Sequence, residues 1–62
     1  MNNIKKEMQK QGIRQNALCE RLKISVSHFR AIKDCETVPN VYLAYAIARE
    51  LKVSINYLFK LD

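Results

Sequence analysis

The residues that can begin or end a helix divide this sequence into short segments. Gly12 is the only glycine and Pro39 the only proline. Glycine adopts at little cost the left-handed backbone that ends a helix, and the residue before a proline is disfavoured in a helix. Ser25, Asn40 and Ser54 are good N-caps because their side-chain oxygens can accept a hydrogen bond from a free backbone amide. The sequence therefore predicts several short helices.

Apolar residues recur at helical spacing within these segments. Leu18, Cys19 and Leu22, for example, have the i, i+1, i+4 spacing of a short amphipathic helix. The expected helices cover residues 3–11, 15–22, 26–34 and 41–51, with a short helical turn after Ser54. No segment shows the alternation of a strand. We therefore predict an all-α fold of four to five helices, forming a single domain over residues 1–62 that buries roughly 60% of its unfolded surface.

Basic side chains are concentrated in the first half of the chain, whose overall net charge is +5. Residues 1–33 contain eight Lys or Arg and two acids, a balance of +6, whereas residues 34–62 contain three Lys or Arg and four acids, a balance of −1. Lys and Arg neutralise phosphates and release condensed counterions. The asymmetry favours a polyanion docking on the N-terminal half, and the alternative is a merely solvated basic surface.

The sequence indicates neither membrane insertion nor metal binding. The longest uncharged stretch, residues 37–48, is shorter than the ~20 apolar residues of a membrane span and is broken by Pro39. The charged first ten residues do not resemble a secretory signal, so we expect a cytoplasmic protein with reduced cysteines and no membrane partner. Cys19 and Cys35 lack CxxC spacing and accompany one distant histidine. We therefore expect no metal and no cofactor, with Cys19 packed in the core.

The second and third predicted helices are joined by about three residues. Such a pair can hold its second helix clear of the body for insertion into the DNA major groove. The segment from Gln15 to Ile32, QNALCERLKISVSHFRAI, resembles the helix-turn-helix signature of the phage repressor and Cro-type (XRE-like) family. Residues 38–48 and 51–59 are similar to the last two helices of that family. The resemblance implies a compact lambda-repressor-like DNA-binding domain whose third helix enters the major groove.

The resemblance also implies roles for single residues. The candidates for reading base edges are Ser25, Val26, Ser27, Arg30 and Ala31. Among them only Arg30 has the forked donors for guanine O6 and N7, whereas Val26 and Ala31 can touch a thymine methyl. The candidates for phosphate contact are Arg14, Gln15, His28, Lys33 and Asn40. For Arg30 the alternative is a phosphate contact or a solvated side chain, and for His28 a solvated side chain.

Several positions depart from the family pattern. Met8 and Lys33 stand where the family commonly has an arginine and a glutamate, so apolar packing is expected to replace a partly buried bridge and free Lys33 for a phosphate. Lys23 and Cys35 stand where glycine is common. Either both turns are strained or the third helix ends differently, and we favour altered geometry at Cys35. Arg14 replaces the usual cap of the second helix, which is therefore expected to lack one.

Site-specific DNA binding usually employs two copies on two half-sites, so we expect a homodimer on DNA. Its interface candidates are Tyr57, Phe59 and Leu61, which alternatively complete the core. Starting at Met1 and lacking a sensor segment, the chain is expected to be a complete minimal regulator of the phage or mobile-element kind, a repressor before an activator. The rival is a protein-interaction module on the same fold, such as an antirepressor or antitoxin partner. No catalytic constellation can be assembled, so an enzyme is not expected.

Overall fold

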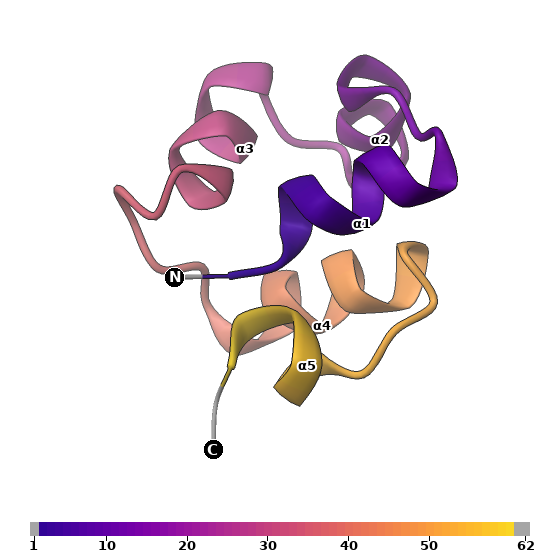
Figure 1. Ribbon diagram of the computed structural model, residues 1–62. Coiled ribbons are helices and arrows are strands. Elements are labelled where there is room, and N and C mark those ends of the chain that lie inside the picture. Colours follow the sequence, from indigo (N-terminus) through magenta and orange to yellow (C-terminus); the bar gives the residue numbers. More distant parts are fainter. Residues whose placement is uncertain (1, 61–62) are drawn as a thin grey trace.

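The computed structural model describes residues 2–60, which form five short helices (Figure 1). They are α1 (Ile4–Gln11), α2 (Gln15–Leu22), α3 (Val26–Lys33), α4 (Val41–Glu50) and α5 (Ile55–Phe59). Residues 2–60 contain no strand, so the all-α prediction is confirmed. The four longer helices begin and end within one residue of the predicted boundaries. Among the described residues, none of the helices has the length and apolar character needed to cross a membrane.

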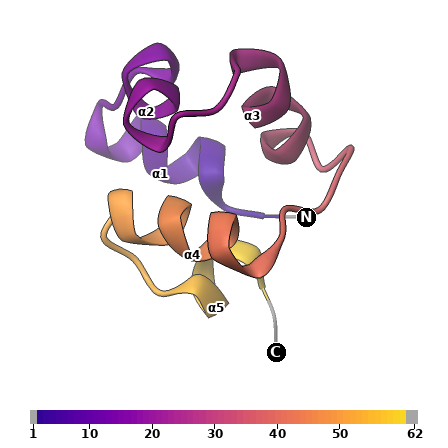
Figure 2. The same cartoon turned by 180° about the vertical axis from the view of Figure 1, so that it is seen from behind.

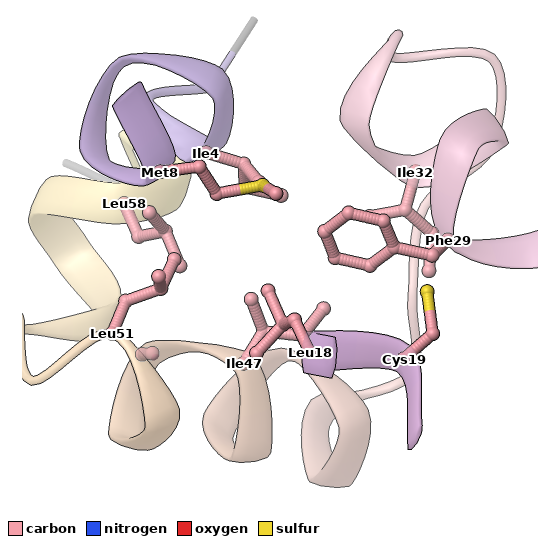
Figure 3. Close-up of a cluster of buried hydrophobic side chains, with 10 residues drawn as sticks. Ile4, Met8, Leu18, Cys19, Phe29, Ile32, Ile47, Leu51 and Leu58 are labelled. Atoms are coloured by element: carbon pink, nitrogen blue, oxygen red, sulfur yellow. The ribbon is translucent and has the colours of Figure 1, made fainter. Parts of the chain in front are cut away.

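The helices surround one small core. In both ribbon views α2 and α3 lie side by side, and α4 and α5 lie together on the other side of the molecule (Figures 1 and 2). Side chains from α1 to α5 and from Leu51, directly after α4, meet between them (Figure 3). The buried cluster consists of Ile4, Met8, Leu18, Cys19, Phe29, Ile32, Ile47, Ala48, Leu51 and Leu58. Every helix thus depends on the same core for its position.

Cys19 and Met8 both serve this core. Cys19 is 3% exposed, and its sulfur points toward Phe29 in Figure 3, which confirms the predicted packing role. Burial raises the pKa of the Cys19 thiol and so keeps it protonated. Met8 is buried beside Ile4 on α1. Apolar packing thus occupies the position at which the resembling family commonly has a charge, in agreement with the prediction.

Helix starts follow the predicted caps. The side-chain oxygens of Ser25, Asn40 and Ser54 each accept the backbone amide three residues further along the chain, at 2.8 to 3.1 Å. Each bond satisfies one of the amides that a helix N-terminus leaves without a partner. No side chain of the described residues caps α2 in this way, because Arg14 has no oxygen to offer. All four observations match the predictions.

Four helix ends share one geometry. At Gly12, Lys23, Cys35 and Lys52 the backbone is left-handed, with φ between 58° and 69°. In each case the amide of that residue donates to the carbonyl three residues back, and the next amide donates to the carbonyl five residues back. These two bonds define the Schellman motif and satisfy carbonyls that the helix end leaves free. The prediction that Gly12 ends α1 in this way is confirmed.

The prediction of altered geometry at Cys35 is wrong. Cys35 takes the left-handed conformation, with φ of 64°. This costs a non-glycine residue about 1–2 kcal/mol. The motif places Glu36 N at 2.8 Å from Ala31 O and Cys35 N at 3.1 Å from Ile32 O, and each such bond contributes about 0.5–1.5 kcal/mol. The two bonds offset the backbone cost, so α3 ends as it would with glycine.

The chain ahead of α1 connects two other helices. Asn2 donates its side-chain amide to Ile32 O at 3.0 Å, near the end of α3. Asn3 donates its side-chain amide to Tyr57 O and its backbone amide to Leu58 O, both at 2.8 Å. Residues 2 and 3 therefore tie the ends of α3 and α5 to the start of α1.

A glycine at a left-handed helix end should stabilise the protein. Replacing Lys52, which is exposed and has φ of 58°, by glycine (Lys52→Gly) removes a steric cost and should raise the free energy of unfolding by about 1 kcal/mol. The same change at Lys6→Gly, inside α1, is the matched control and should lower it by about 0.5–1 kcal/mol. Urea unfolding measures both. Destabilisation by Lys52→Gly would show that the lysine side chain contributes more than its backbone costs.

Candidate nucleic-acid interface

The connection between α2 and α3 determines how α3 is presented. Lys23 turns the chain in its left-handed conformation, Ile24 packs partly into the core, and Ser25 caps the next helix. Phe29 and Ile32 then bury the inner side of α3, at 0% and 1% exposure. Residues between those positions consequently face away from the core. The outer side of α3 is left to make contacts outside the fold.

Of the five predicted base-reading candidates, Ser27, Arg30 and Ala31 lie on this outer side and Ser25 lies at its start, whereas Val26 packs partly against the core. Ser25, Ser27 and Arg30 are exposed, and Val26 and Ala31 are half-buried. The guanidinium of Arg30 forms no hydrogen bond or ion pair with any other residue of the described chain, so its five donors remain available. The Ser25 hydroxyl already accepts His28 N at 3.0 Å. Ser25 therefore keeps its proton and one lone pair for a further contact.

Two phosphate candidates meet across the helix pair. Lys33 donates its ammonium to Gln15 Oε1 at 3.0 Å, which joins the last residue of α3 to the first residue of α2. Lys33 is therefore not the free side chain that the sequence predicted. The bond leaves the Gln15 side-chain amide and two ammonium protons as donors. Arg14, exposed, directly precedes Gln15, so three candidate donors gather at the N-terminus of α2.

His28 and Asn40 are not part of that hydrogen-bonded group. His28 is exposed on α3 and Asn40 is exposed at the start of α4. Asn40 accepts Leu43 N at 2.8 Å as a cap, which occupies its carbonyl oxygen but leaves its amide group as a donor. Neither side chain hydrogen-bonds to Gln15 or Lys33 within the described part of the chain. Arg14, Gln15 and Lys33 are thus grouped at the N-terminus of α2, whereas His28 and Asn40 are not bonded to that group.

The basic half of the chain is largely unneutralised. Arg21 pairs with Glu50 and so joins α2 to α4, and this is the only ion pair among residues 2–60. Seven of the eight Lys or Arg in residues 1–33 are exposed, and Lys33 is half-buried. The acids Asp34 and Glu36 are exposed directly after α3. A phosphate backbone is therefore favoured along α2 and α3 more than beside the loop that follows α3.

The dimer candidates contribute to the fold itself. Tyr57 is 38% exposed, and its hydroxyl donates to Glu7 Oε2 at 2.8 Å. Phe59 is half-buried and packs against the core. Leu61 lies outside the described residues. Tyr57 and Phe59 thus act at least in part as the core-completing residues that the sequence left as an alternative.

The Glu7 carboxylate is the polar feature that the sequence reasoning missed. Glu7 is 3% exposed, yet both of its oxygens are paired. Gln11 donates to Glu7 Oε1 at 2.9 Å and to Leu51 O at 2.7 Å, and Tyr57 holds the other oxygen. Hydrogen bonds from Gln11 and then Tyr57 hold the pKa of the Glu7 carboxyl below its ordinary value. The i, i+4 spacing of Glu7 and Gln11 was the signal available in the sequence.

Comparison with known proteins adds no relative. A scan against models of protein families and a search of curated proteins find no match for this chain. Within residues 2–60, no three His, Cys, Asp or Glu side chains are grouped so that they could hold a metal ion. The functional proposal therefore depends on the outer side of α3 and on the charges around it.

The Glu7 network should make stability pH-dependent. Its folded pKa lies below the ordinary value of 4.5, so the stabilisation is fully present above that pH and is lost as the pH falls through the lower folded value. Glu7→Gln should lower the thermal midpoint near neutral pH, and the gap from wild type should narrow on going from about pH 6 to about pH 3. Glu20 is exposed on α2, so Glu20→Gln is the control. It should leave the thermal midpoint unchanged at both pH values. A gap that stays constant with pH would contradict the role of the Glu7 charge.

Proposed function

We propose that this protein is a non-catalytic regulator that binds double-stranded DNA with α3 in the major groove. The observation that carries the proposal is the outer side of α3, where Ser27 and Arg30 are exposed while Phe29 and Ile32, with partly buried Val26, pack the inner side against the core. An eight-residue helix held only by its inner side presents the rest of its surface to a groove about 12 Å wide. Blocking a promoter is the simplest consequence, so we propose a repressor.

Phosphate contacts would position the helix, and few base contacts would specify the site. Arg14, Gln15 and Lys33 offer charged and amide donors beside the N-terminal amides of α2, a favourable place for a phosphate. Arg30 would donate both arms of its guanidinium to a guanine, and Val26 and Ala31 would contact thymine methyl groups. With one strong reader, DNA shape and deformability would supply part of the selectivity.

The size of the protein suits one half-site. Its extents are 29 × 23 × 18 Å, and half-sites one helical turn apart are separated by ~34 Å. Two copies side by side would therefore each cover one half-site. We accordingly propose a homodimer on DNA, in which a weak single contact is multiplied by the second.

The second candidate is a protein-interaction module on the same fold, such as an antirepressor or antitoxin partner. It is favoured by the half-buried, apolar side chains of Val26 and Ala31, which offer no hydrogen bonds to a base. The unneutralised basic residues of α1 to α3 favour DNA instead. Absence of duplex binding at low salt would select this candidate over the first.

Binding to DNA selected from a randomised duplex pool tests the proposal. Arg30→Ala should weaken binding to the selected duplex by about 1–3 kcal/mol and relax specificity at one position. Lys33→Ala should weaken binding to all duplexes and reduce the slope of log K against log salt by about one unit. Because Lys33 also holds Gln15, Gln15→Ala combined with Lys33→Ala should cost less than the two single changes added together.

Lys52→Ala provides the matched control for charge. It removes one positive charge from the end of α4, far along the chain from α3, and should leave the salt slope unchanged. An equal slope reduction by Lys52→Ala and Lys33→Ala would indicate only diffuse attraction. In that case the assignment of α3 as the inserted helix would be rejected.

A further inference from the structure

Large apolar side chains gather on the surface formed by the α3–α4 loop and α4. Val38 is 91% exposed, Val41 68%, Tyr42 84% and Tyr45 67%. These four residues, here called the α4 face, make no contribution to the buried cluster. Contiguous apolar surface of this kind on a small protein marks an interaction site. The α4 face is therefore a docking surface whose occupant has to be identified.

A groove of about 440 Å³ opens beside these side chains. Val38 and Val41 belong to its wall, together with Cys35, Ala44, Ile55 and Phe59. Tyr42 is not part of the wall and follows Val41 on α4. Tyr45 lies one helical turn after Val41 and is also the i+3 neighbour of Tyr42, so these exposed side chains form one continuous surface that adjoins the apolar recess.

Charge argues that the occupant is a second copy of this chain. Residues 37–48 contain no charged side chain, although the chain carries a net charge of +5. A strongly charged partner would find no complementary charge on the α4 face. Two copies would repel one another at most orientations, but this face brings two uncharged stretches together. Pairing through the α4 face therefore brings no like charges of residues 37–48 together.

We propose that two copies pair through the α4 face, with Tyr42 of each copy inserted in the groove of the other. A two-fold interface requires a self-complementary patch. If one residue of the first copy contacts a second residue of the other copy, the same contact is repeated with the copies exchanged. A projection adjoining a recess meets that requirement. Tyr57, an interface candidate from the sequence, has its hydroxyl engaged by Glu7.

The available area agrees with a weak dimer. At the observed exposures the two tyrosines and two valines offer roughly 500 Å² per copy, or about 1,000 Å² in all. Specific protein interfaces begin at about that area. The pairing should therefore be weak in solution and should be strengthened when both copies bind one duplex.

Pairing through the α4 face also determines which end of α3 lies near the two-fold axis. What this means for an operator rests on the proposed function. Ile32 and Cys35, at the C-terminal end of α3, border the groove. Pairing through the groove brings these ends of the two α3 helices together and leaves Ser25 at the distant ends. On an operator, Arg30 would then read bases closer to the centre than those near Ser25.

Sedimentation velocity of the free protein tests the pairing. At an ionic strength of about 0.3 M, which screens the net charge, wild type should shift from monomer toward dimer between about 5 and about 500 µM. Val38→Lys and Tyr42→Lys should each weaken the association at least about tenfold, because the dimer would bury two unpaired charges. Both side chains are exposed, so circular dichroism should show an unchanged fold.

Gln9→Lys, exposed on α1, adds the same charge elsewhere and should associate like wild type. The rate at which a thiol reagent modifies Cys35 provides a second readout, since pairing covers the groove wall. The modification rate of Cys35 should fall with rising protein concentration for wild type and Gln9→Lys. It should not fall for Val38→Lys or Tyr42→Lys. Monomeric wild type at the highest concentration, or equal association of Val38→Lys and Gln9→Lys, would overturn the proposal.

Duplex binding is measured separately, so the two proposals can fail independently. Duplex binding by a protein that stays monomeric in solution and on DNA would reject the α4 face as a self-association surface and leave DNA binding in place. Dimer formation without duplex binding would support the α4 face and reject the DNA proposal. Capture of a different protein by a monomeric wild type would also overturn pairing.

Discussion

The burial of Phe29 beneath α3 is the contact on which the proposed interface depends. An isolated helix of eight residues is marginal in water, so α3 takes both its stability and its direction from packing. Phe29 is fully buried, and the small side chain of Cys19 lies opposite it on α2. A larger residue at Cys19 would push α3 outward and tilt Arg30 with it. Core packing and the placement of the reading side chains are therefore one property of this molecule.

Most of the fold could be predicted because its helix boundaries are local. Ser25, Asn40 and Ser54 cap the helices that follow them, and neither caps nor apolar spacing requires knowledge of distant residues. The ending of α3 at Cys35 could not be predicted in the same way. The expectation weighed the cost of a left-handed cysteine but not the two hydrogen bonds that this conformation makes available. Whether those bonds outweigh the cost depends on the whole turn.

In the candidate site, too, the features that depend on local sequence could be predicted, and the contacts between helices could not. The inward positions of Phe29 and Ile32 follow from helical period, and the exposure of Ser27 and Arg30 follows with them, whereas the base-reading roles rest on the resemblance and stay a prediction. The Lys33–Gln15 bond joins two helices, and its geometry depends on how α2 and α3 cross. The Glu7–Tyr57 bond spans 50 residues and gives a predicted interface residue a role within the fold. Contacts of this kind arise from tertiary packing, which no local pattern in the sequence reports.

The distribution of charge suggests why so small a protein would need two kinds of surface. Under the proposed function, a single copy would have one strong base reader, Arg30, and a few phosphate contacts, so its affinity for any one site would be modest. Adding more cations would raise binding to all DNA without improving discrimination between sequences. Pairing through an uncharged face instead doubles the base contacts and leaves non-specific attraction per copy unchanged. A weak dimer that completes itself on the duplex would thus gain selectivity from the second copy, while the free protein stays largely monomeric.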